Sequence, residues 1–131
     1  MKIVRVICFT LCLSMLSCSK IEPDYLETLQ IIGVWKLESL TLGGITSMSV
    51  ECCDYIEFMT DDIPRDSIGF FKALGLGYEN IGRFEVSEAQ DSLVFKWDTK
   101  QRNVAFEMNN DLLTLFYLED SILVVEDWRK Q

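Results

Sequence analysis

From residue 33 onward, the chain alternates hydrophobic and polar residues in short runs, with turn-forming residues between the runs. In the run Ser92 to Trp97, for example, Leu93, Phe95 and Trp97 share one face. Such alternation indicates β-strands, because successive side chains of a strand point to opposite faces. Eight runs of this kind predict strands at residues 33–42, 52–60, 67–74, 80–87, 92–97, 102–108, 112–118 and 122–129.

The segments between these runs are short and contain typical turn residues. Gly43-Gly44, Gly75-Leu76-Gly77 and Asn109-Asn110 suit tight turns or bends, since Gly and Asn tolerate a positive φ. Pro64 marks a loop, because proline cannot donate a ladder hydrogen bond. Connections this short join antiparallel neighbours, and closure removes the two open edges of such a sheet. We therefore predict an all-β fold, an eight-stranded antiparallel up-and-down barrel.

A short helix is predicted before the first strand. Asp24 followed three residues later by Glu27 is typical of a helix start, and Leu26 and Leu29 are spaced to share one face. We expect this helix to pack across one end of the barrel. The alternative is a loosely ordered tether, since helices this short are marginal by themselves.

The first 17 residues have the three parts of a secretory signal. Lys2 and Arg5 give a positive start, an apolar run follows over residues 6–16, and Ser17 is small. The apolar run is too short for a membrane-spanning helix, which needs about 20 residues. We therefore divide the chain into a signal peptide at 1–17, a tether with the short helix at 18–30, and one barrel domain at 31–131.

The stretch Leu16-Ser17-Cys18 resembles the lipobox of bacterial lipoproteins. The resemblance implies that the Cys18 thiol receives a diacylglycerol, that cleavage occurs before Cys18, and that the new amino group is acylated. More than one acyl chain anchors stably, since each buried CH₂ contributes about 0.8 kcal/mol. Ser19 resembles the outer-membrane sorting pattern, so we expect a lipid-anchored envelope protein at the periplasmic or the surface face of the outer membrane. The alternative is plain secretion, with Cys18 removed or idle.

The composition excludes several classes of function. The 131 residues include 12 Lys and Arg against 21 Asp and Glu, for a formal net charge of −9. Nucleic-acid recognition takes clustered basic residues, so we predict no nucleic-acid partner. The absence of histidine excludes Ser-His-Asp and Cys-His catalysis and removes the commonest nitrogen ligand of zinc. We predict no catalytic residues, no metal site and no cofactor, and we expect that the protein is not an enzyme.

Acidic side chains also gather in a few places along the chain. Three aspartates share the loop at 61–66 and offer oxygen ligands, but they lack the spacing and the distal Glu of a dedicated Ca²⁺ loop. Two further pairs of carboxylates occur in turns that favour exposure. We interpret all of these as surface acids, namely Asp61, Asp62, Asp66, Glu85, Glu88, Glu119 and Asp120.

The adjacent pair Cys52 and Cys53 is chemically unusual. Neighbours on a regular strand point to opposite faces, which separates the two sulfur atoms. We expect structural thiols with Cys52 buried, while a disulfide between the two cysteines needs a distorted backbone. Both interpretations stay open, together with a redox or metal role, because an exported protein meets oxidants.

The opening of the first strand, Gly33-Val34-Trp35, resembles the Gly-x-Trp opening of lipocalins. The stretches GVWKLESL, GRFEVSEAQDSLVF and LLTLFYLEDSILVVEDWRKQ resemble small bacterial lipoproteins with a lipocalin-like domain. In lipocalins a basic residue late in the barrel packs over the opening Trp, so the resemblance implies that Arg129 packs over Trp35. It also implies that a small apolar ligand binds inside the barrel.

An eight-stranded barrel is just wide enough to be filled by side chains or to hold one small ligand. The ligand hypothesis gives as candidate pocket residues Trp35, Leu37, Phe84, Phe95, Trp97 and Phe106. The same rings also suit a packed core, since their burial is strongly stabilising. We therefore predict a lipid-anchored lipocalin-like barrel that binds a small apolar ligand. The alternative is a filled barrel that serves as a non-catalytic interaction or structural protein of the envelope through the loops at 43–50 and 61–67.

Overall fold

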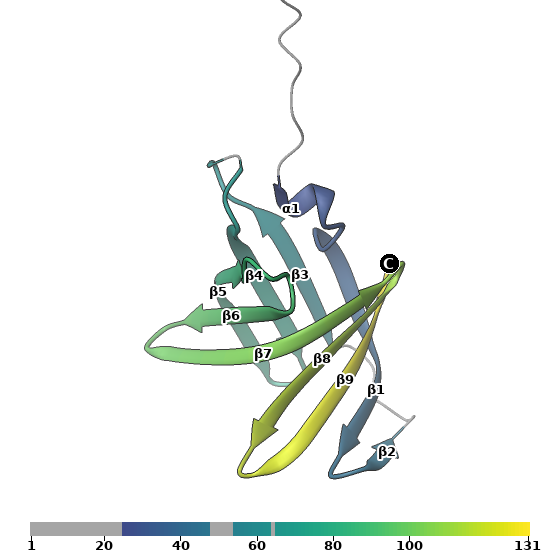
Figure 1. The fold of residues 1–131 in the computed structure, drawn as a ribbon. Helices are drawn as coiled ribbons and strands as arrows, with labels where there is room; N and C mark the ends of the chain where they lie inside the picture. The colour runs from purple at the N-terminus through teal and green to yellow at the C-terminus, as the bar shows by residue number, and fades with distance from the viewer. Residues whose placement is uncertain (1–24, 48–53, 64) are drawn as a thin grey trace, which may run out of the picture.

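The chain forms a closed barrel of eight antiparallel strands. Figure 1 shows how the strands are arranged. The computed structural model describes residues 25–47, 54–63 and 65–131. Each barrel strand pairs with the next along the barrel, and pairing of the first with the last closes it. The predicted fold class is confirmed. The barrel strands are β1 (Gly33–Leu42), β3 (Tyr55–Thr60), β4 (Ile68–Gly75), β5 (Tyr78–Val86), β6 (Ser92–Trp97), β7 (Lys100–Asn109), β8 (Leu112–Glu119) and β9 (Ile122–Lys130).

A ninth strand, β2 (Ile45–Ser47), lies beside the second half of β1 and was not predicted from the sequence. Gly43 and Gly44 connect β1 to β2 with φ angles of 56° and 88°, so the predicted two-glycine turn is confirmed. All three residues of β2 are exposed. A strand of three exposed residues has no buried face, and its sequence therefore carries no alternation of apolar and polar residues.

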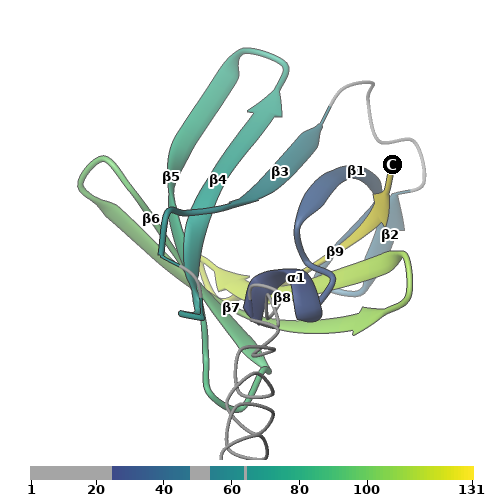
Figure 2. The ribbon, with the colours of Figure 1, turned by 90° about the horizontal axis from the view of Figure 1, so that it is seen from above.

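The predicted short helix is present as α1 (Tyr25–Thr28), and it covers one end of the barrel, as seen from above in Figure 2. Leu26 is only 1% exposed and belongs to the hydrophobic core, and Leu29 packs against that core. Just after the helix, the indole Nε1 of Trp35 donates a 2.8 Å hydrogen bond to the carbonyl of Ile31. Packing of one apolar face thus holds a helix that is too short to be stable alone.

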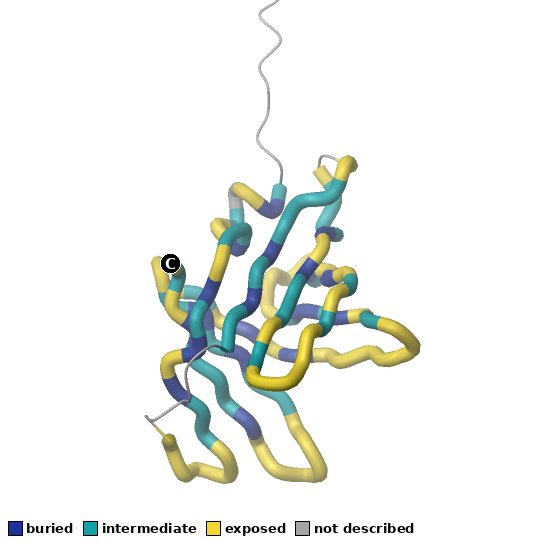
Figure 3. The backbone as a smooth tube through the Cα atoms, turned by 180° about the vertical axis from the view of Figure 1, so that it is seen from behind, coloured by how far each residue is buried: buried dark blue, intermediate teal, exposed yellow. Residues whose placement is uncertain are grey.

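Aromatic side chains fill the half of the barrel next to α1. The Phe58 and Phe84 rings meet edge to face, with centroids 4.9 Å apart and planes at 78°. Trp35 is fully buried in the same core cluster, and buried segments occupy the middle of the strands in Figure 3. Burial of each such side chain contributes about 1.5–3 kcal/mol. This half of the barrel is therefore a packed core.

The backbones of β5 and β6 come unusually close at Gly82. Gly82 pairs with Phe71 of β4, whose side chain points into the barrel. A Cβ at Gly82 would collide with the carbonyl oxygen of Lys96 on β6. Glycine at this inward position therefore allows the close approach of β5 to β6.

Candidate ligand-binding cavity

A cavity of about 270 Å³ opens at the end of the barrel opposite α1. Its position follows from the topology, since the residues that line it lie toward the end of β6 and the start of β5 and β7. The lining is mostly apolar or aromatic, with a few polar groups. It consists of Ile56, Phe71, Ala73, Tyr78, Asn80, Phe95, Trp97, Arg102, Val104, Leu115, Tyr117, Glu126 and Trp128.

Two of the six candidate pocket residues, Phe95 and Trp97, line this cavity. Phe95 contacts Phe71 edge to face, with centroids 4.9 Å apart, and Trp97 is partly buried next to them. The other four candidates do not line it but are buried in the core. These four are Trp35, Leu37, Phe84 and Phe106.

Glu126 places a carboxyl group on the inner face of β9, two residues before Trp128. One oxygen accepts a 2.7 Å hydrogen bond from the Tyr117 hydroxyl, and the other accepts a 3.1 Å hydrogen bond from the Trp128 indole Nε1. Burial raises the pKa of Glu126 above its ordinary value, while the two donors and the Arg102 charge act in the opposite direction. Burial, together with the Glu126 charge, also raises the pKa of Tyr117.

Arg102 lines the cavity from β7 with a side chain that is 42% exposed, and its guanidinium lies near two aromatic rings. Its guanidinium carbon is 4.7 Å from the Tyr117 ring centroid and 5.9 Å from that of Trp97. An ion pair with Glu119 is long, at 3.7 Å. Across the part of the chain that the structure describes, its guanidinium makes no hydrogen bond within 3.5 Å. The N–H donors of Arg102 are thus free to meet a ligand.

Tyr78 stands at the rim of the cavity, at the start of β5. Its hydroxyl donates a 3.3 Å hydrogen bond to Asp54. Burial and the nearby Asp54 carboxylate raise the pKa of Tyr78 to about 12. A Cβ at Gly75 would collide with the Tyr78 ring, so the glycine leaves room for this side chain.

Arg102, Tyr117, Glu126 and Trp128 were not among the candidates from the sequence. The signal that could have found two of them is a charged residue in phase with inward apolar residues. Arg102 has the same parity as Val104, and Glu126 has the same parity as Trp128. A charged side chain at such a position points into the barrel.

The basic residue over Trp35 is Lys130, which corrects the expectation for Arg129. The Lys130 Nζ lies 5.3 Å from the Trp35 ring centroid and donates a 2.7 Å hydrogen bond to the carbonyl of Gln30. Lys130 pairs with Trp35 in register, so both side chains share the inner face, whereas Arg129 faces outward. Gly33 lies close to Lys130, because a Cβ there would be 3.0 Å from the Lys130 Cε.

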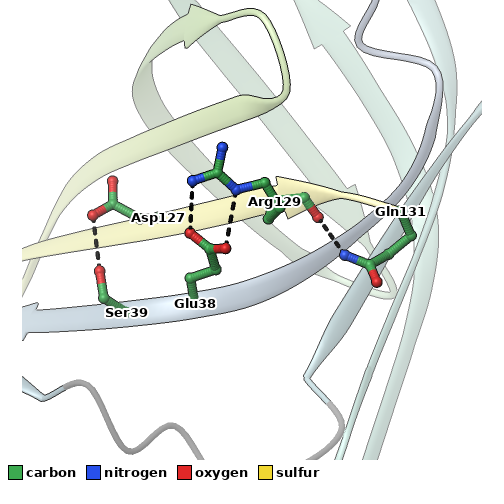
Figure 4. A network of polar contacts seen from close by, with 5 residues as sticks. All are labelled: Glu38, Ser39, Asp127, Arg129 and Gln131. Carbon is green, nitrogen blue, oxygen red and sulfur yellow. Dashed lines mark hydrogen bonds and ion pairs between the residues drawn. The ribbon is translucent and has the colours of Figure 1, made fainter.

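Figure 4 shows a polar network on the outer face of β1 and β9, where these strands close the barrel. Arg129 donates two 3.0 Å hydrogen bonds to the Glu38 carboxylate, and this pairing lowers the pKa of Glu38. The Ser39 hydroxyl donates a 2.8 Å hydrogen bond to Asp127. Gln131 adds a hydrogen bond to the carbonyl of Arg129. The network joins the first and last strands, and we assign it a structural role.

The acidic loop at 61–66 uses two of its aspartates to form turns. Asp61 accepts a hydrogen bond from the backbone N–H of Ile63, and Asp66 accepts one from Ile68. In the described parts of the chain, no group of three or more His, Cys, Asp or Glu side chains is arranged to hold a metal ion. Cys18, Cys52 and Cys53 lie outside the described residues.

Comparison with protein-family models, with curated proteins and with solved structures found no match for this chain. The likeness to lipocalins and to bacterial lipoproteins therefore stays a prediction from the sequence. Among the residues that the structure describes, none belongs to a helix of sufficient length and hydrophobicity to cross a membrane.

Proposed function

We propose that this protein is a lipid-anchored, exported binding protein whose barrel holds one small apolar ligand. The observation that supports the proposal is the cavity of about 270 Å³ inside the barrel. A mostly apolar and aromatic lining with a few polar groups is typical of small-molecule sites. The proposed role is binding without catalysis.

The lipid anchor is proposed from the lipobox-like stretch that ends at Cys18. In the barrel, the described chain begins at α1, opposite the cavity. An anchor before α1 would leave the mouth of the cavity facing away from the membrane, where it can exchange ligand with the aqueous phase. Growth with radiolabelled palmitate tests the anchor, since the label is expected in the native chain and not in Cys18→Ala. Equal labelling of both would contradict it.

Native mass spectrometry of the full chain, purified in mild detergent from a bacterial host, tests ligand binding. We expect a small-molecule adduct that leaves on gentle activation. Ala73 lines the cavity, so Ala73→Phe should fill the space and remove the adduct. Ala105 is exposed on the outside of β7, so Ala105→Phe is the matched control that should keep it. A bare native protein, or an adduct unchanged in Ala73→Phe, would refute binding in this cavity.

The second candidate function is a non-catalytic interaction protein of the envelope. Three hairpins at the open end of the barrel expose apolar side chains, with Ile45 79%, Leu76 81% and Leu118 72% exposed. Exposed apolar residues that gather at one end are typical of interaction surfaces. A partner that crosslinks to the native protein and is lost when these three residues are changed to serine, with the adduct retained, would favour this function.

A further inference from the structure

Two side chains of opposite charge line the same apolar cavity. Arg102 comes from β7 and Glu126 from β9, and Tyr117 on β8 contacts both of them. A buried carboxylate such as that of Glu126 is unfavourable unless it is paired and hydrogen-bonded, whereas Arg102 at the cavity mouth keeps contact with water. The pair therefore restricts which ligands the cavity can accept.

The Glu126 carboxylate has acceptor sites to spare. A carboxylate offers about four lone-pair sites, and Tyr117 and Trp128 use two of them. Burial disfavours the charged form of Glu126 and raises its pKa. A cationic group beside the carboxylate would offset this cost, because it stabilises the charged form. A ligand ammonium group fits this requirement.

The Arg102 guanidinium has donors to spare. Its planar fork has five N–H donors and matches the geometry of a carboxylate. The rings of Trp97 and Tyr117 pack near it, and within the described residues its ion pair with Glu119 is long, at 3.7 Å. Stacking on rings orients the guanidinium without using its donors, so a ligand carboxylate can bind there.

A ligand with a single charge would meet a side chain of the same charge in this cavity. A carboxylate alone would be repelled by Glu126 and by the net charge of −9, and an ammonium alone would be repelled by Arg102. A ligand that carries both groups can pair with both side chains and adds no net charge. Electrostatics therefore favours a zwitterion.

The size and the walls of the cavity limit the rest of the ligand. About 270 Å³ is equivalent to roughly nine water molecules and is below the typical range for drug-sized ligands. Phe71, Phe95 and Leu115 provide an apolar wall. We propose that the cavity binds a hydrophobic α-amino acid, with its carboxylate at Arg102, its ammonium at Glu126 and its side chain against these residues. This ligand class rests on the proposed binding of one small molecule in the barrel, and it replaces the wholly apolar ligand by one that has an apolar side chain and two charged groups.

Calorimetry with four ligands of one shape tests the ligand class on the full chain in mild detergent. L-Phenylalanine carries both charges, 3-phenylpropanoate only the carboxylate, 2-phenylethylamine only the ammonium, and 3-phenylpropanamide neither. Loss of a hydrogen bond to a charged group should weaken binding by roughly tenfold to a hundredfold. We therefore expect L-phenylalanine to bind at least tenfold more tightly than each of the other three.

Two variants assign each charge to its partner. Arg102→Met should weaken L-phenylalanine and 3-phenylpropanoate but not 2-phenylethylamine, and Glu126→Gln should weaken L-phenylalanine and 2-phenylethylamine but not 3-phenylpropanoate. Arg83→Met is a matched control, because Arg83 stacks on Phe70 at 5.4 Å on the outside of the barrel. It should leave all four affinities unchanged.

The four ligands and the host-derived adduct separate two kinds of failure. If 3-phenylpropanamide binds as tightly as L-phenylalanine, the zwitterion is refuted and apolar binding stands. If none of the four binds while the native protein carries an apolar adduct, the amino acid is again refuted and the proposed function stands. If neither the four ligands nor an adduct binds, both proposals fail. The ligand series needs only the native chain, so it decides the question even if a variant does not fold.

Discussion

The adjacent residues Phe70 and Phe71 offer a direct test of which face of β4 forms the core. Phe71 is 3% exposed and meets Phe95 and Trp97 edge to face, at centroid distances of 4.9 and 6.2 Å. Phe70 is 37% exposed and contacts Arg83. Replacing each by alanine removes the same atoms from the chain. Any difference in stability therefore reports the two environments.

The structure predicts a large difference between the two variants. Truncation of a buried Phe costs about 3–5 kcal/mol, and we expect the lower end for Phe71, because one side of its ring already faces the cavity. For Phe70→Ala we expect about 1 kcal/mol, which corresponds to an exposed cation–π contact and a partly buried ring. The predicted gap is about 2 kcal/mol.

Urea unfolding of the full chain, followed by tryptophan fluorescence, measures both free energies of unfolding. A domain of this size is stable by about 5–15 kcal/mol, so both variants should remain folded, and Phe71→Leu provides a milder version. The slope with urea should not change between variants. Equal losses for Phe70→Ala and Phe71→Ala, or a larger loss for Phe70→Ala, would refute the assignment of the inner face.

Three further predictions concern single residues. The pKa of Glu126 is raised on folding, so the native protein should lose stability as the pH rises from about 4.5 through the folded pKa. Glu126→Gln should remove this loss. Urea unfolding from about pH 4 to 8 measures the free energy of unfolding of both proteins. Lys130→Met should cost about 1–2 kcal/mol through the lost ring contact and hydrogen bond, and Arg129→Met should cost less, since its ion pair is exposed. Equal thermal shifts for the two variants would contradict this. Gly82→Ala should cost about 1–3 kcal/mol or more by forcing β5 away from Lys96, and an unchanged melting temperature would be contrary evidence.

Alternation along the chain was enough to predict the barrel strands, because their inner faces are apolar throughout the middle of the barrel. It failed where the inner face turns polar. The structure begins β5 at Tyr78 and β7 at Lys100, two residues earlier than predicted for each. At the mouth of the barrel both faces carry polar residues, so the period of two disappears from the sequence. The polar half of the cavity lies in this region.

The sequence shows which face a side chain takes but not at which depth in the barrel it lies. Phe84 and Phe95 both alternate as inward residues, yet only Phe95 lines the cavity. Depth is set by the pairing of strands, which depends on contacts between distant residues such as Trp35 and Lys130. The wrong expectation that Arg129 packs over Trp35 was avoidable. Lys130 lies two residues after the inward Trp128, so its side chain points to the same face.

The stability and the ligand affinity of a Glu126 variant distinguish a role of this residue in folding from a role in binding. Burial makes its charged form unfavourable and raises its pKa, so we expect the fold to be more stable with a neutral group there. Gln at this position can keep both contacts, accepting from Trp128 and donating to the Tyr117 hydroxyl. If Glu126 served only the fold, Glu126→Gln would be stable and would bind ligand as before. A variant that is as stable as the native protein, or more stable, and that has lost affinity for an amino acid would show that the charge is retained for binding at the expense of stability.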